Sequence, residues 1–191
     1  MEKIKLGYAM TGSFCTLDKS IKEMAGLAAQ GCDILPIMSE NVYTVSTRFG
    51  KAQDIVTRVE DIAQKSVIHT VSGAEPIGPR KLCDVLLVAP CTGNTLSKIA
   101  LGITDTPVTM AVKSQLRIGA PVVLCVASND ALGASAENIG KLLNRKNVYF
   151  VPLSQDDPHN KPNSLVAHFE LIPDSVRSAL MGRQLQPIFA S

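Results

Sequence analysis

Aromatic residues and net charge are both scarce in this sequence. Its 191 residues include no tryptophan, three tyrosines and five phenylalanines, so few rings are available on which unpaired bases could stack. The formal net charge is only +2, which is too small for a basic face that follows a phosphate backbone. Nucleic acid is therefore not expected as a partner.

Long apolar runs, cysteine pairs and histidine clusters are also missing. The longest uncharged apolar stretch, Ile118–Ser128, has little more than half of the ~20 residues that a membrane helix requires, so no membrane partner is expected. The N-terminal residues contain no apolar signal-peptide core, so the mature chain is expected to begin there. Five cysteines without a Cys-x-x-Cys pair favour reduced thiols in the cytoplasm over disulfides. The three histidines are scattered, and no metal site is expected.

The sequence is instead rich in apolar residues, at 46%, with 19% charged residues against ~25% in an average soluble domain. This composition excludes a disordered chain and favours a large core, a buried sheet or a substantial subunit interface. Apolar β-branched runs alternate with segments of helical period. The pattern predicts strands at 3–9, 33–38, 82–89, 121–127 and 148–151, and helices at 19–30, 53–64, from about 95, at 134–143 and at 164–181.

Strands that are apolar on both faces and alternate with helices indicate a parallel sheet covered on both sides. With right-handed crossovers, the prediction is an α/β fold, namely a three-layer, Rossmann-like (flavodoxin-like) doubly wound parallel sheet. We expect one domain over residues 1–191, with a polar loop at 154–163 before a C-terminal helix at about 164–181.

Ligands of such sheets bind at the carboxyl ends of the strands, and small polar residues follow four of the predicted strands. In the first loop, Gly12 and Ser13 would let a phosphate approach the backbone. The loop is not Gly-x-Gly-x-x-Gly, and no Gly-Lys-Ser/Thr follows, which weakens dinucleotide and triphosphate binding and leaves a mononucleotide phosphate. A tight turn with a helix cap remains the alternative for this loop.

The loop after the third strand carries more information. Thr92, Asn94 and Thr95 follow a wholly apolar run, and their hydroxyls and amide would satisfy the edges of a heterocycle or a phosphate. Helix capping by Thr95 is the alternative. The loop after the fourth strand, Ser128-Asn129-Asp130, is typical of a cap when taken alone. Three such loops on one edge of one sheet favour a binding site.

These loops resemble those of the flavoprotein family of FMN-binding cysteine decarboxylases and flavin prenyltransferases. The matching motifs are Gly12-Ser13 and the string from Pro90 to Thr95, followed by Lys98-Ile99-Ala100. Further strings resemble, within that family, one subunit of a two-subunit oxidoreductase that aromatises a small cyclic dicarboxylate. They are Thr47–Gly50, Ala74–Pro79, Ala89–Lys98, Ser128–Gly133 and Gln184–Pro187.

The resemblance implies an FMN-type Rossmann-like fold that assembles as a trimer or dodecamer and works with a second, different subunit. It implies an FMN phosphate near three residues, Gly12, Ser13 and Ser39. It places the flavin ring against the loop that contains Pro90, Thr92, Gly93, Asn94 and Thr95, with Ser128 nearby. The hydride acceptor is this FMN or an NAD(P) carried by the second subunit.

The sequence also departs from the decarboxylases. Where they carry Pro-Ala-Met-Asn, this chain has Val126-Ala127-Ser128-Asn129, so only Asn129 carries over. Their catalytic histidine lies shortly before the third-strand aspartate, whereas His69 stands 15 positions ahead of Asp84. The decarboxylase mechanism is therefore not transferred, and His69 is more typical of a packed or surface residue.

Oxidation of a dicarboxylate requires cations for the carboxylates, a hydride acceptor and a base. We expect Arg48 or Arg117 to bind a carboxylate, with Arg48 favoured because Phe49-Gly50 predict a bent loop. We expect Glu75 to act as a base if it is partly buried, and Asn129 to take part in catalysis. Cys91 would either face the flavin or simply pack. Two alternatives stay open: an FMN-dependent decarboxylase or prenyltransferase, and a flavin-free scaffold for the second subunit.

Overall fold

The sheet is dominated by five parallel strands in the computed structural model, which describes residues 3–190. They are β1 (Lys5–Met10), β2 (Asp33–Met38), β3 (Val85–Cys91), β4 (Val122–Ser128) and β5 (Val148–Phe150). Two short strands, β6 (Leu153–Ser154) and β7 (Leu165–Ala167), pair antiparallel with each other, and β7 pairs antiparallel with β4. The seven strands follow the order β2-β1-β3-β4-β7-β6, with β5 also on β4. The sheet is thus mixed rather than purely parallel.

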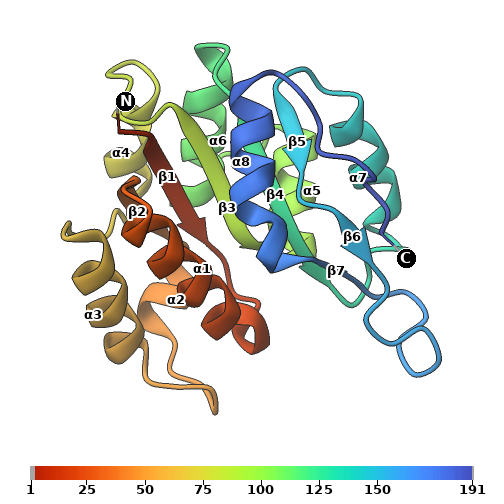
Figure 1. Cartoon of the computed structure of the whole chain (residues 1–191). Helices are drawn as coiled ribbons and strands as arrows, with labels where there is room; N and C mark the ends of the chain where they lie inside the picture. Colours follow the sequence, from red (N-terminus) through yellow and green to blue (C-terminus); the bar gives the residue numbers. More distant parts are fainter. Residues whose placement is uncertain (1–2, 191) are drawn as a thin grey trace.

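Helices cover both faces of this sheet (Figure 1). On one face lie α1 (Leu17–Ala29) and α8 (Ile172–Leu180), and on the other lie α5 (Gly93–Leu101) and α6 (Pro107–Arg117). The remaining helices are α2 (Glu40–Thr44), α3 (Ala52–Ala63), α4 (Val71–Ala74) and α7 (Ala136–Leu143), with single 3₁₀ turns η1 (Phe14–Thr16), η2 (Glu75–Ile77) and η3 (Phe169–Leu171). The predicted three-layer, doubly wound α/β architecture is confirmed.

Apolar side chains on both faces explain why the central strands are so uniform. Every residue of β3 is buried, because α8 packs on one side of it and α6 on the other. A strand with no solvent-facing side has no need for polar alternation. The core therefore runs through the centre of the sheet, and polar side chains are left to the loops at its edges.

The predicted C-terminal helix at 164–181 is wrong in its first part. Residues 165–167 form β7, because Leu165 and Val166 pair with the end of β4, and the α-helix begins only at Ile172. Pro173 in the first helical turn is the sequence signal for that start. Between β6 and β7, residues 155–163 form turns.

Helix α6 was not predicted as a separate helix from the sequence. Its start carries a capping box, in which the Thr106 and Thr109 side chains each bond the other's backbone, and Pro107 occupies the first turn. This helix follows α5 on the same face of the sheet and leads the chain into β4. Among residues 3–190, no helix is long and apolar enough to cross a membrane.

The topology places a crevice at the carboxyl ends of β1 and β3. The chain leaves β1 for β2 on one side and later returns to β3 on the other, so β1 and β3 flank a switch point. Loops that follow such neighbouring strands diverge toward opposite faces and leave room for a ligand between them.

Candidate functional site

Two adjoining hollows occupy this carboxyl edge and share Gly12 and Thr92. The first, of about 440 Å³, is called the hydroxyl pocket here, and its lining includes Gly12, Ser39, Thr92, Asn94, Thr95 and Thr106. The second, of about 620 Å³, is called the cationic cleft, and its lining includes Ser13, Lys19, Arg48, Ser128, Asn129, Asp156 and Lys161. Both volumes lie in the range of small-molecule sites, roughly 300–1,000 Å³.

Thr11 joins the loops after β1 and β3. Its side chain is buried, donates to the Pro90 carbonyl over 2.8 Å and accepts from the Thr92 N–H over 3.0 Å. The Thr11 N–H also donates to the Pro90 carbonyl. One hydroxyl therefore fixes the relative position of two ligand-facing loops. Thr11 belongs to the loop predicted to face a ligand after the first strand, but it was not among the predicted site residues, although a polar residue at the end of an apolar strand was the available signal.

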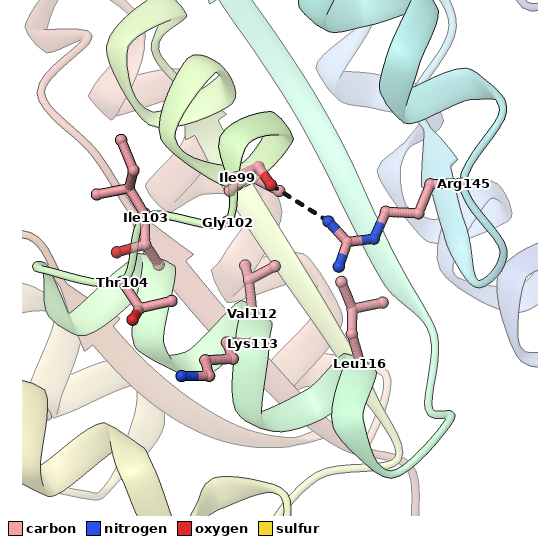
Figure 2. Close-up of a pocket in the computed structure, with 9 residues that line it drawn as sticks. Ile99, Gly102, Ile103, Thr104, Val112, Lys113, Leu116 and Arg145 are labelled. Carbon is pink, nitrogen blue, oxygen red and sulfur yellow. Dashed lines mark hydrogen bonds between the residues drawn. The ribbon is translucent and has the colours of Figure 1, made fainter.

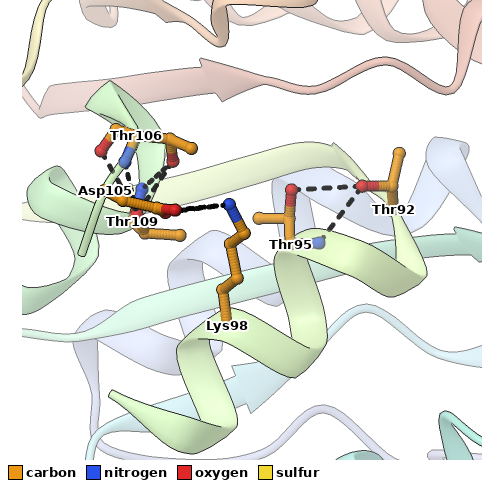
Figure 3. Close-up of polar contacts among 6 residues, drawn as sticks. All are labelled: Thr92, Thr95, Lys98, Asp105, Thr106 and Thr109. Carbon is orange, nitrogen blue, oxygen red and sulfur yellow. Dashed lines mark hydrogen bonds and ion pairs between the residues drawn. The ribbon is translucent and has the colours of Figure 1, made fainter. Parts of the chain in front are cut away.

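Thr92 is the N-cap of α5, and backbone N–H groups near it have no acceptor among the described residues. Its hydroxyl accepts from the Thr95 N–H over 3.3 Å and donates to the Thr95 hydroxyl over 3.1 Å (Figure 3). Within residues 3–190, the backbone N–H groups of Gly12, Gly93 and Asn94 have no acceptor. Free N–H groups at a helix start, with the positive end of the helix dipole, suit a phosphate or an electron-rich ring edge.

Gly93 allows two elements to pack closely. A Cβ at this position would lie 2.8 Å from Ser128 Oγ and 2.9 Å from Ser135 Oγ, closer than such atoms approach one another. The absence of a side chain lets the start of α5 sit directly against the end of β4. This contact brings Ser128 and the α5 N-terminus to the same wall of the cationic cleft.

Ser39 gives the hydroxyl pocket an unsatisfied group. It occupies the N-cap position of α2 but makes no side-chain capping bond. Its Oγ is buried and lacks a hydrogen-bond partner within residues 3–190. Because a buried hydroxyl without a partner costs free energy, Ser39 fits a ligand that supplies an acceptor, such as a phosphate oxygen. Ser39 and the free N–H groups thus supply donors that suit the phosphate of a mononucleotide, in a lining that also contains the carboxylate of Glu40.

The cation of the hydroxyl pocket is already neutralised. Lys98 Nζ lies 2.8 Å from Asp105 Oδ2 and 2.9 Å from Oδ1 (Figure 3). The hydrogen bond from Lys98 lowers the pKa of the Asp105 carboxyl below its usual range. Donation in this pocket therefore comes from hydroxyls and backbone N–H groups, with Lys98 held to the side.

The cationic cleft has the opposite character. Lys19, Arg48 and Lys161 line it together with one carboxylate, Asp156. Lys161 pairs with Asp156 at 3.3 Å, whereas Lys19 and Arg48 form no ion pair among the described residues. The Arg48 guanidinium carbon lies 4.9 Å from the centre of the Phe49 ring, a cation–π contact that restrains it.

The structure brings together most of the predicted site residues but not Glu75 or Arg117. These two line a separate hollow of about 90 Å³ beside Ser114, and Glu75 is exposed. Ser114 Oγ donates to the Glu75 carbonyl over 2.6 Å and accepts from the Gly78 N–H over 2.8 Å. Because η2 packs against the middle and end of α6, whose start flanks the hydroxyl pocket, Glu75 lies away from the cleft. The expectation of a base at the cleft is therefore corrected for Glu75.

His69 and Cys91 both pack against other residues, His69 at the surface and Cys91 in the core. The exposed His69 ring stacks on Tyr43 at 3.8 Å with an interplanar angle of 6°, and it lines neither hollow. Cys91 is fully buried, and burial raises the pKa of its thiol to about 12. A thiol that stays protonated is neither a nucleophile nor a base.

A fourth hollow, of about 210 Å³, lies between α5, α6 and Arg145 (Figure 2). Arg145 Nη1 donates to the Ile99 carbonyl over 3.2 Å. A cation on a carbonyl in the last turn of a helix stabilises that helix end. Arg145 therefore stabilises the C-terminal end of α5. Among residues 3–190 no group of three His, Cys, Asp or Glu side chains is placed to hold a metal ion.

Comparison with known proteins agrees with this geometry. The model of the family described as Flavoprotein matches residues 1–176. The chain belongs to the flavoprotein family. In open α/β sheets, ligands bind at the carboxyl ends of the strands, which is the edge where these hydroxyls and free N–H groups gather.

Two relatives cover nearly the whole chain. The B subunit of dipicolinate synthase from Bacillus subtilis (strain 168) is 41% identical over 184 residues, which cover 96% of this chain and 92% of the relative. A crystal structure of the B subunit of dipicolinate synthase from Bacillus halodurans is 39% identical and has a TM-score of 0.90, covering 98% of this chain and 96% of that one. An FMN-dependent cysteine decarboxylase, 19% identical over 93% of this chain and 95% of its own, has a TM-score of 0.69 and shares the fold.

Proposed function

We propose that this protein binds FMN and acts as the B subunit of a dipicolinate synthase. With an A subunit it would oxidise dihydrodipicolinate to dipicolinate in the mother cell of a sporulating bacterium. The observation that carries the proposal is the adjacency of the hydroxyl pocket and the cationic cleft, which share Gly12 and Thr92. The hydroxyl pocket, together with Ser13, Gly93 and Ser128 of the adjoining cleft, suits a phosphorylated heterocycle, and the cations of the cleft suit an anionic ring. The similarity to the B subunits of two dipicolinate synthases supports the choice of substrate.

The FMN phosphate is assigned to the Gly12 N–H and to the hydroxyls of Ser13 and Ser39. The buried Ser39 hydroxyl, which has no hydrogen-bond partner in the described part of the chain, supports this assignment. The flavin edge is assigned to the loop that follows Pro90, whose residues Thr92, Gly93, Asn94 and Thr95 line the two hollows, and to Ser128 of the cleft. Pro90 itself is buried at the end of β3 and would act by shaping that loop. FMN, when bound, supplies a two-electron acceptor for a hydride.

The substrate is assigned to the cationic cleft. Arg48 would take one carboxylate in a bidentate pair, since its planar guanidinium matches that shape. The amide of Asn129, which lines the same cleft, would orient the ring. Conversion of the dihydro compound to the aromatic diacid removes one hydride and one proton. FMN, or an NAD(P) carried by the A subunit, would supply the hydride acceptor, and the proton would be released to water.

The proposed assembly is a trimer or dodecamer of this chain that also meets the A subunit. Exposed apolar side chains support a subunit interface, with Leu101 62% exposed and Ile103 42% exposed. Burial of such side chains between subunits removes apolar surface from water. Size-exclusion chromatography with light scattering measures the mass of the free protein and of its mixture with the A subunit.

The proposal is tested by reconstitution. The purified chain, the A subunit and dihydrodipicolinate are combined with or without FMN and NAD(P), and dipicolinate formation is measured. We expect dipicolinate only when both subunits are present, and expect omission of FMN to slow its formation. If the A subunit alone reaches the same rate with NAD(P), the proposed oxidoreductase role is contradicted.

An FMN-dependent decarboxylase or prenyltransferase is the alternative, supported by the shared fold. The Val126–Asn129 string in place of Pro-Ala-Met-Asn counts against it. Release of carbon dioxide from a cysteine-containing peptide, or prenyl transfer to the flavin, by the isolated protein would favour this alternative. A protein without flavin that still raises A-subunit activity would instead be a scaffold.

A further inference from the structure

Three cations reach the cationic cleft from three separate parts of the chain. Lys19 lies in the first turns of α1, Arg48 lies in the segment between α2 and α3, and Lys161 lies in the turns between β6 and β7. With Asp156 as the one acidic residue in the lining, the cleft has a formal excess of two positive charges. Uncompensated charges of one sign in a concave site attract a counter-ion of matching charge.

The hydroxyl pocket next to it shows that this excess is specific to the cleft. There the cation, Lys98, is held by both oxygens of Asp105. In the cleft, Lys161 has a looser ion pair with Asp156, at 3.3 Å with one oxygen. Lys19 and Arg48 form no ion pair among the described residues, and the charge of Lys19 acts on the carboxylate of Glu170 only through space. Of the two hollows, the cleft is therefore the one in which an added dianion gains more.

We propose that Lys19 and Lys161 are specificity-determining residues that bind the second carboxylate of a planar dicarboxylate, while Arg48 binds the first. Lys161 exchanges its partner Asp156 for the ligand when the ligand enters. The identity of the ligand as dipicolinate rests on the proposed function. The selection of a dianion over a monoanion rests on the charges of the cleft alone.

The test compares dipicolinate with picolinate, which lacks the second carboxylate. Affinities are measured by isothermal titration calorimetry on the full-length protein with FMN added, in metal-free buffer, for wild type, Lys19→Gln and Lys161→Gln. The matched control is Lys22→Gln, an exposed lysine of the same helix α1 that does not line the cleft. Circular dichroism and thermal unfolding check that each variant folds.

We expect the wild type to prefer dipicolinate, and each cleft variant to bind dipicolinate about tenfold more weakly, the loss of one charge-assisted contact. Picolinate affinity should change little, and Lys22→Gln should match the wild type for both ligands. The inference is overturned if the cleft variants bind dipicolinate as tightly as the wild type, or if the wild type does not distinguish the two ligands.

Two further arms separate this inference from the assignment of the cofactor and from the proposed function. The phosphate of FMN is the other anion that the lysines could serve, so FMN and riboflavin affinities are measured for the same variants. A loss of FMN affinity with riboflavin unchanged would overturn the inference. Lysine-dependent binding of dipicolinate and of isophthalate, without dihydrodipicolinate oxidation in the presence of the A subunit, supports the inference and removes the proposed function.

Discussion

Two polar regions of this molecule contain similar residues but differ in their hydrogen bonding: in one the polar groups have partners, and in the other several have none among the described residues. In the η2–α6 contact, Ser114 donates to the Glu75 carbonyl and accepts from the Gly78 N–H, so each of these groups has a partner. At the carboxyl edge of the sheet, the Ser39 hydroxyl and the Gly12 N–H have none among the described residues. A closed contact contributes stability, and an open one retains donors for a ligand. The difference favours the carboxyl edge as the functional side that we propose.

The largest expected effect is a loss of stability at one of two glycines, Gly78 in the η2–α6 contact and Gly93 at the carboxyl edge. A Cβ at Gly78 would overlap the Ser114 carbonyl oxygen and lie 2.6 Å from its carbon, and a backbone group cannot turn aside. Gly78→Ala should lower the free energy of unfolding by about 3 kcal/mol or more. Urea unfolding followed by circular dichroism measures this loss.

Gly93→Ala is the partner of that variant. Its Cβ would meet only side-chain hydroxyls, those of Ser128 and Ser135, which are able to rotate or shift. We expect a smaller stability loss than in Gly78→Ala and a weaker FMN affinity, by about tenfold or more, because the start of α5 moves. Equal effects of both variants on FMN affinity per folded molecule would break the comparison.

Two buried hydroxyls provide a second pair. Thr11→Val removes the bonds to Pro90 and Thr92, and Ser114→Ala removes those to Glu75 and Gly78. Each should cost about 1–3 kcal/mol of stability, since buried groups lose their partner. Only Thr11→Val should also weaken FMN binding, and Thr11→Ser should restore it. If Ser114→Ala weakens FMN binding as much, the two regions are not functionally distinct.

The buried thiols predict how stability depends on pH. Burial raises the pKa of Cys83 and Cys91 from 9.0 to about 12, so between these values the unfolded chain releases protons that the folded chain keeps. Stability should therefore fall as pH rises above 9, by up to about 1.4 kcal/mol per pH unit for each thiol. Urea unfolding from pH 8 to 10 measures this slope, and Cys91→Ala should reduce it. An unchanged slope in that variant would contradict the account of Cys91 as a buried, protonated thiol.

The smallest effect is expected for Glu75→Gln. Because Glu75 is exposed and lines the small hollow beside α6 rather than the cleft, the variant should keep kcat and KM of the reconstituted enzyme within about twofold, below one kcal/mol in barrier. Arg48→Ala serves as the positive control and should raise KM for the dicarboxylate. A large fall in kcat for Glu75→Gln alone would show that Glu75 reaches the reacting atoms, for example across a subunit interface.

Local patterns predicted the sheet and most of the carboxyl edge, because apolar strands and small polar loops are features of neighbouring residues. Gly12, Ser13, Thr92 and Ser128 could be placed there from topology alone. What failed depended on partners distant in the chain. Residues 165–167 became a strand through pairing with β4, and Glu75 went to α6 through a bond from Ser114. Neither contact has a local signature.

The cations of the cleft illustrate the same limit. Arg48 was predicted from the bent loop that follows it, whereas Lys19 and Lys161 reach the same cleft from segments more than a hundred positions apart. Only the fold shows that they share a site.

The most direct test of the central claim is the visible spectrum of the purified protein after addition of FMN and removal of the excess by gel filtration. We predict a retained flavin spectrum at close to one FMN per chain, weakened in Ser39→Ala and in Gly93→Ala and unchanged in Ser114→Ala. A wild-type protein that retains no flavin would contradict the account. The hydroxyl pocket would then not be a cofactor site, and the redox chemistry would belong to the partner subunit.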